Sequence, residues 1–182
     1  MKTVILVVML TTAILTGCTY PPVRPELSGS IANEFSQRKA PDTGGRLYVA
    51  MGVYKTPLIT VSRGWDSGEL FINGARIEAV HNNPEFIVID LQPGQYIVTW
   101  LPLAGFERSN TRANPAVVTV QDGEVQFLAL DATEGMNWGA AFGVIGALAG
   151  VNRVADVRKE ITGNMLEGRK PVSYTDLRKQ KL

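Results

Sequence analysis

The sequence predicts a mainly β protein: a small antiparallel β-sandwich with helical segments on its C-terminal side. Short runs rich in β-branched and aromatic residues alternate with turn signals about every ten residues, which is the spacing of sandwiches and barrels. The dipeptides Asn73-Gly74 and Asp122-Gly123 are typical of tight hairpin turns. With 182 residues, the chain is long enough for one domain with a sizeable core.

The predicted β domain spans residues 44–132 and begins with a strand from Arg46. Alternate residues of this strand form one apolar face: Leu47, Val49, Met51 and Val53. The central stretch, residues 69–100, predicts strand, turn, strand, loop, strand, Pro-Gly turn and strand, in the middle of one antiparallel sheet. Its run Phe86 to Ile89 is nearly continuous apolar, which indicates a strand covered on both faces or at a sheet centre.

The segment after the β domain changes character, and we expect a helical appendix over residues 133–168. Residues 136–151 carry no charge and contain two GxxxG spacings, formed by Gly139, Gly143, Gly146 and Gly150. Such spacing lets two helices approach closely. This helix either packs on the sheet or lies in the membrane interface, or it drives self-association or inserts into the bilayer as a short hairpin-like segment. Sixteen residues reach about 24 Å as a helix, which is too short to span a bilayer.

An amphipathic helix is expected next, from Val151 to about Met165, because its apolar residues recur at helical spacing. The tail, residues 169–182, is basic. It is either a solvated, mobile tail or a contact for anionic lipid head groups or an acidic partner.

The N-terminus predicts export and lipidation. Residues 1–17 combine Lys2 with a short apolar run and form a signal peptide. Leu15-Thr16-Gly17-Cys18 has the pattern of a bacterial lipobox, in which the Cys18 thiolate takes a diacylglyceryl group and the freed amine is acylated. The alternative is an ordinary export signal with a chance cysteine, although Cys18 is the only cysteine in the chain. Thr19 after the cysteine favours the outer membrane.

Residues 18–43 are expected to form a lipidated, semi-extended tether, because Pro and Gly/Ser residues are frequent there. A short helix is expected within it, at Ile31 to Lys39.

Composition and motifs give no sign of catalysis. Removing residues 1–17 removes Lys2 alone among the charged side chains and leaves 17 basic and 17 acidic residues, which argues against a nucleic-acid partner. His81 is the only histidine, and no nucleophile, phosphate-binding or metal-ligand motif accompanies it. We therefore expect no enzyme activity, no cofactor and no metal. Trp65 and Trp100 are either core residues or the walls of a ligand groove.

A resemblance to a known family rests on the central stretch. Asn73-Gly74, then Leu91, Pro93-Gly94 and Tyr96 form a pattern similar to that of the DUF2846 family of bacterial lipoproteins and, more loosely, to PEGA-type β-domains. The similarity covers roughly residues 45–131. It implies a small β-sandwich on a lipid anchor, with no established activity and no catalytic residues to carry over.

Together these patterns indicate an envelope lipoprotein with a structural or protein-interaction role. It would be anchored in the outer membrane through Cys18, face the periplasm and bind an envelope protein. The alternative is a module that binds a small ligand or a glycan through an aromatic face around Trp65 and Trp100.

Overall fold

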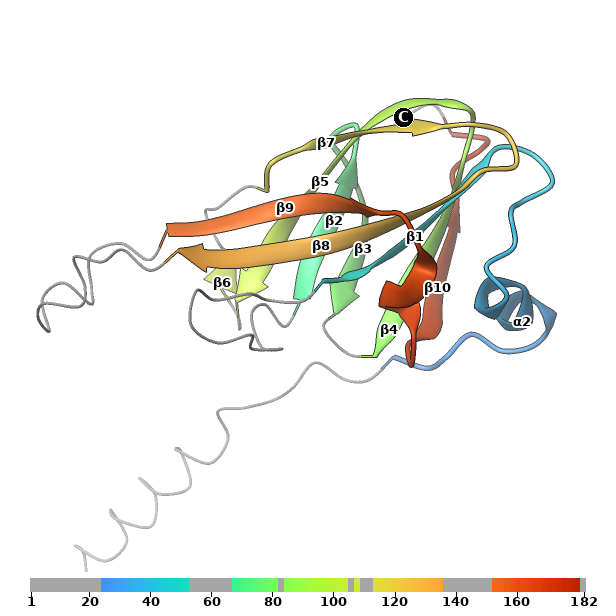
Figure 1. Cartoon of the computed structure of the whole chain (residues 1–182), viewed down its shortest axis with the longest axis horizontal. Helices are drawn as coiled ribbons and strands as arrows, with labels where there is room; N and C mark the ends of the chain where they lie inside the picture. Colours follow the sequence, from blue (N-terminus) through green and yellow to red (C-terminus); the bar gives the residue numbers. More distant parts are fainter. Residues whose placement is uncertain are drawn as a thin grey trace, which may run out of the picture.

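The computed structural model describes residues 24–52, 67–81, 84–104, 107–108, 113–135 and 152–180. Within these ranges the protein is mainly β and forms two sheets in a β-sandwich-like arrangement, as predicted (Figure 1). Sheet A has the strand order β10 (Lys170–Asp176), β4 (Glu85–Leu91), β1 (Gly45–Met51), β8 (Val125–Gly135) and β9 (Asn152–Glu160). Sheet B has the order β3 (Ala75–His81), β2 (Ser67–Ile72) and β5 (Gly94–Ala104), with β6 (Glu107–Arg108) and β7 (Ala116–Val120) both paired to β5.

The main core lies between the two sheets. Alternate side chains of β1 and β4 point into it, as expected of extended strands, and they meet residues of sheet B such as Leu70, Val98 and Trp100. The predicted apolar face of β1 is confirmed for Leu47 and Val49, which are fully buried in this core.

A second, smaller core covers the opposite face of sheet A. Helix α2 (Ser30–Ser36) and the 3-10 helix η3 (Gly163–Leu166) supply Phe35 and Leu166, which join Tyr48, Phe86 and Val88 of β1 and β4 in one cluster. Because both faces are covered, every residue of β4 is buried. This confirms the expectation from its continuous apolar run.

The central stretch does not form the middle of one antiparallel sheet. Asn73-Gly74 is the predicted hairpin turn between β2 and β3, and both residues have positive φ, 49° and 82°, as a type I′ turn requires. Gln92-Pro93, in contrast, leads from β4 in sheet A to β5 in sheet B. Asp122-Gly123 leads back from β7 in sheet B to β8 in sheet A. A turn dipeptide reports a local reversal, but it does not determine which sheet the next strand joins.

Sheet A is mixed rather than antiparallel. β1 runs parallel to β8, and β10 runs parallel to β4, whereas the β1–β4 and β8–β9 pairs are antiparallel. These parallel neighbours are far apart in the sequence, so no turn signal between them could have predicted the pairing.

The predicted amphipathic helix from Val151 to Met165 is wrong. Residues Asn152–Glu160 form β9, which pairs along its whole length with β8, from Phe127–Glu160 to Gly135–Asn152. The ladder gives the edge of β8 a hydrogen-bonding partner, and this tertiary pairing overrides the weak helical periodicity. The apolar segment 136–151 with its four glycines lies outside the described residues.

The tail is not a free basic segment. Lys170–Asp176 form β10 at the edge of sheet A, and Leu177 is buried in the main core. A strand forms here because β4 would otherwise leave the N–H and C=O groups of one edge unpaired, and the main chain of β10 pairs with them. Sheet A therefore takes two of its five strands from the stretches predicted as helical appendix and tail.

Candidate functional site

The N-terminal segment, residues 24–43, is docked on the domain instead of forming a semi-extended tether. A helix occurs where one was predicted, as α2, and its Phe35 is buried against sheet A. Leu27 N donates a 2.9 Å hydrogen bond to Pro171 O in β10. The described chain thus begins beside the start of β10, and α2 lies next to the same strand (Figure 1).

A buried ion pair lies beneath this segment. Arg46 of β1 and Asp90 of β4 are directly opposite each other in the ladder, on the α2 side of sheet A. The guanidinium donates from Nε to Oδ1 at 2.7 Å and from Nη2 to Oδ2 at 2.9 Å. Arg46 is 4% exposed and Asp90 is 0% exposed, so this bidentate pair is almost fully removed from water. A pair of this kind is tolerated only when its remaining polar atoms are satisfied as well.

The N-terminal segment satisfies the third nitrogen of Arg46. Nη1 donates to Glu34 Oε1 of α2 at 2.6 Å and to the main-chain oxygen of Lys39 at 3.0 Å. The guanidinium also lies 4.8 Å from the ring centre of Phe35, a cation–π contact. Burial alone would lower the pKa of Arg46, but the hydrogen bonds to Asp90 and Glu34 outweigh it and raise that pKa.

The C-terminal segment completes the network on the other side of Asp90. Tyr174 of β10 donates from its hydroxyl to Asp90 Oδ2 at 3.0 Å, and Arg178 Nη2 lies 3.8 Å from the same oxygen. Burial, followed by the charge of Asp90, raises the pKa of Tyr174 to about 12. Arg178 also pairs with Asp176 at 2.7 Å, and its hydrogen bond lowers the pKa of Asp176 to about 2.

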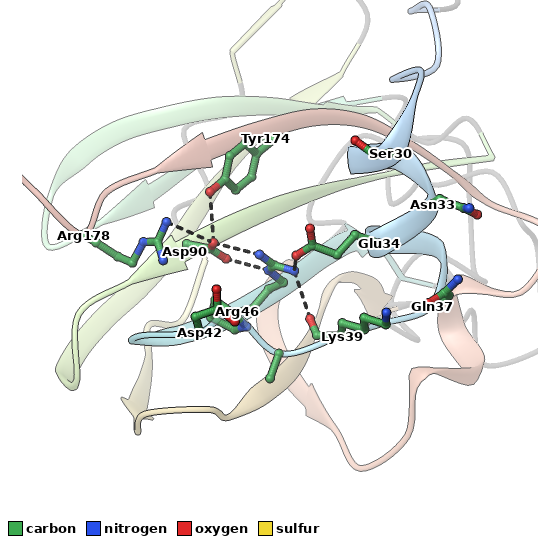
Figure 2. A pocket seen from close by; sticks show the side chains of 12 residues that line it. Ser30, Asn33, Glu34, Gln37, Lys39, Asp42, Arg46, Asp90, Tyr174 and Arg178 are labelled. Carbon is green, nitrogen blue, oxygen red and sulfur yellow. Dashed lines mark hydrogen bonds and ion pairs between the residues drawn. The ribbon is translucent and has the colours of Figure 1, made fainter.

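These side chains border an open polar cleft of about 600 Å³ between α2, β1, β4 and the end of β10. Figure 2 shows Arg46, Tyr174 and Arg178 converging on Asp90, while Glu34 of α2 meets Arg46 from the other side. The charged groups of this network are engaged with one another. Its chemistry is therefore that of a clamp, which ties the two ends of the described chain to sheet A.

A second polar cluster closes the edge of the sandwich where β3 approaches β4. Arg24 reaches Glu78 of β3 at 3.1 Å and Glu85 of β4 at 2.8 Å, and so it bridges sheets B and A. Glu78 also accepts a 2.8 Å hydrogen bond from Ser173 of β10. His81, at the end of β3, lies beside this cluster. Burial, followed by the charge of Arg24, lowers its pKa, and its Nδ1 is buried without a hydrogen-bond partner.

The outer face of sheet B differs from that of sheet A, because no described segment covers it. Ile97 of β5 and Val117 of β7 are paired across the ladder there, and they are 53% and 62% exposed. Next to them Phe71, Thr99 and Leu101 line a shallow, largely apolar hollow. An exposed, contiguous apolar patch of this kind is typical of a protein-contact surface.

Trp100, one of the two predicted ligand-contact residues, lies in the core. It is 1% exposed, and its indole Nε1 donates a 3.0 Å hydrogen bond to the main-chain oxygen of Asp156. β5 turns this side chain toward sheet A, so the core reading of Trp100 is the correct one. Trp65, Cys18 and the four glycines Gly139, Gly143, Gly146 and Gly150 lie outside the described residues.

The basic residues of the tail do not form one patch. Lys170, paired with Glu26 at 3.1 Å, stands at the start of β10, whereas Arg178 follows its end. Arg169 is half-buried, and burial lowers its pKa. The seven residues of β10 separate the two groups by about 20 Å, so the described part of the tail, residues 169–180, does not gather its basic residues in one patch.

Sequence reasoning missed the clamp. No pairing of Asp90 can be read from the sequence, and Arg46 is identified there only as the start of a strand. One signal was available: each is a charged residue within or beside a strand of apolar, β-branched residues, and a charge in such a place needs a partner. The partner's identity depends on strand register, which the sequence does not state.

The fold and its clusters define a class: a two-sheet, β-sandwich-like domain whose N-terminal segment is clamped onto one sheet. Comparison with family models, with curated proteins and with solved structures finds no match for this chain. Within the described ranges, no group of histidine, cysteine and carboxylate side chains is arranged to hold a metal ion. None of the helices described there is long and apolar enough to cross a membrane.

Proposed function

We propose that this protein is a lipoprotein of the bacterial envelope, anchored through Cys18 in the outer membrane, that binds an envelope protein through the outer face of sheet B. The anchor rests on the lipobox Leu15 to Cys18 and on the resemblance to the DUF2846 family. The observation that supports an interaction role is the exposed apolar pair Ile97 and Val117, which are neighbours on one sheet face, whereas the exposed Ile31 and Ile161 lie elsewhere in the chain.

The asymmetry of the two sheets supports this choice of surface. Sheet A has its outer face covered by α2 and η3, whereas the outer face of sheet B carries Ile97, Val117 and the hollow lined by Phe71 and Leu101. Covering apolar surface contributes about 25 cal/mol per Å², so a partner that buried this face would gain binding free energy where the domain itself gains none.

The anchor is tested with Cys18→Ala in cells supplied with an alkyne-tagged palmitate. The wild-type protein should incorporate the label and sediment with membranes, and the variant should lose the label and be released or stay unprocessed. Normal membrane fractionation and labelling of the variant would refute the lipoprotein proposal.

The binding face is tested with a photocrosslinking amino acid at Val117 in intact cells. We expect one reproducible crosslinked envelope protein from position 117 and none from position 179, an exposed site beyond the end of β10. With the crosslinking amino acid kept at position 117, Ile97→Lys on the neighbouring strand should abolish the product, because a charge would have to be buried in the interface. Identical products from both positions would show that the face is not selective.

Burial of Trp100 takes away one of the two aromatic residues, Trp65 and Trp100, on which the ligand-binding alternative rests, and so we favour the interaction role. Self-association through the segment 136–151 stays a prediction. If this segment drives assembly, Gly143→Leu should dissociate an oligomer, and an unchanged sedimentation profile would exclude that role.

A further inference from the structure

Docking of the N-terminal segment on the domain determines how far the domain can stand from the proposed lipid anchor. Contacts begin at Arg24, which pairs with Glu78 and Glu85, and continue through Leu27 to α2. Only the residues from Thr19 to Val23 separate Cys18 from Arg24. An extended chain advances at most about 3.6 Å per residue, so Arg24 lies within about 20 Å of Cys18. An undocked tether from Cys18 to Gly44 could extend to about 90 Å.

We propose that the end of the sandwich that carries Arg24, Glu85 and Lys170 faces the lipid surface and stays within about 20 Å of it. This inference rests on the proposed lipidation of Cys18. Its support is the placement of the first described residues at one end of the domain, beside the start of β10 (Figure 1).

The opposite end of the domain is held away from the lipid. β4 and β10 run parallel from the Arg24 end, and a strand of seven residues spans about 20 Å. The turn Asn73-Gly74, the connection Gln92-Pro93 and the residues after β10 lie at that far end. The strands therefore point away from the membrane. Ile97 donates its main-chain N–H to Asn73 Oδ1, so the exposed pair Ile97 and Val117 lies toward the end that is held away from the lipid.

The charges at the Arg24 end do not form a basic patch. Arg24 is shared by two carboxylates, and Lys170 is paired with Glu26. The short spacer, and not attraction to anionic head groups, therefore holds this end at the surface. Moderate salt should leave this orientation of the domain unchanged. A Debye length shorter than about 10 Å weakens interactions between exposed charges, and the spacer does not depend on them.

The experiment compares two lysines on the same strand. Lys170 begins β10, Lys179 follows its end, and both are exposed. Because acylation consumes the only native thiol, at Cys18, Lys170→Cys or Lys179→Cys supplies a single labelling site. Each full-length acylated protein is labelled with a donor fluorophore and inserted from outside into phosphatidylethanolamine and phosphatidylglycerol vesicles that contain an acceptor-labelled head group.

Energy transfer should be at least about twofold higher from position 170 than from position 179, because about 20 Å separates the two sites along the strand. Inserting twenty Gly/Ser residues after Val23 should reduce this difference, since the insertion lengthens the spacer and leaves the fold intact. Equal transfer from the two sites of the acylated protein, or more from position 179, would overturn this inference without contradicting the lipoprotein proposal. Cys18 without acyl chains in the mass spectrum would instead refute the lipoprotein proposal.

Discussion

The outer faces of sheets A and B are built in opposite ways. On sheet A the chain buries a charged pair, Arg46 and Asp90, and covers it with segments from both of its ends. On sheet B it leaves two large apolar residues, Ile97 and Val117, exposed to solvent. Burial is therefore no simple guide to polarity in this protein. The covered face buries an ion pair beside the apolar cluster of Phe35, Tyr48 and Val88, whereas sheet B carries exposed hydrophobic residues as well as the ion pair of Arg76 and Glu69.

The two faces differ in what their residues do for the fold. A buried bidentate pair contributes little net stability, but breaking it is costly, so it specifies one arrangement of the segments that complete it. An exposed apolar pair contributes nothing to that arrangement, and this is why we propose sheet B as the binding face.

Removing the charge of Asp90 should have the largest effect. Asp90→Asn removes the buried, bidentate partner of Arg46 and leaves the partly exposed Glu34 as its counter-charge, which should cost up to about 3–5 kcal/mol in the free energy of unfolding measured with urea. The matched control is Asp176→Asn, which weakens the exposed pair with Arg178 and should cost at most about 1 kcal/mol. Equal losses of unfolding free energy from the two variants would show that the buried pair contributes no more to stability than the exposed pair does.

Tyr174→Phe should have the next largest effect. The variant loses the hydroxyl that donates to Asp90, and a hydrogen bond to a charged group is worth about 1.5–3 kcal/mol. The pKa of Tyr174 is raised to about 12, whereas an unfolded tyrosine ionises near 10. The unfolded wild-type chain therefore releases this proton first, and the stability advantage of the wild type over the variant should shrink as the pH rises from about 10 to 12. A constant difference across that range would contradict the assignment.

The same substitution on the two outer faces sharpens the comparison. Val88→Thr places a hydroxyl in the small core beneath α2, which should cost about 1–3 kcal/mol. Val117→Thr changes an exposed residue and should alter the free energy of unfolding by no more than about 0.5 kcal/mol. If Val117→Thr proved as costly as Val88→Thr, the face of sheet B would be covered within the protein.

The smallest expected effect concerns His81 at the Arg24 cluster. Its pKa is lowered by burial first and by Arg24 second, so the unfolded chain binds this proton at a higher pH than the folded protein does. The groups around it are Arg24, which opposes protonation, and Glu78 and Glu85, which favour it. Stability should fall as the pH drops below about 6.5, and His81→Gln should lose less stability than the wild type over that range. Parallel pH profiles of the two proteins would contradict this prediction.

The sequence was informative where structure is local. The type I′ turn at Asn73-Gly74, the covered strand β4 and the short helix α2 follow from dihedral preference, apolar content and short-range pattern, and all three occur. Prediction from the sequence failed where the structure of a segment depends on its contacts with distant segments. The residues of β9 were predicted as a helix because β8, their partner, contributes nothing to local periodicity. The clamp was missed for the same reason: Arg46 meets Asp90 through strand register, 44 positions along the chain.

The pairing of β10 with β4 has a consequence for the order in which the protein folds. Leu27, near the start of the described chain, binds the main chain of Pro171, near its end. If the protein is exported and lipidated as proposed, residues 24–43 emerge before the strand that receives them. Docking then waits until β10 has emerged, and pairing between such distant segments is slow. Until that moment the proposed lipid anchor and the domain are joined by the undocked segment, and docking brings them closer together.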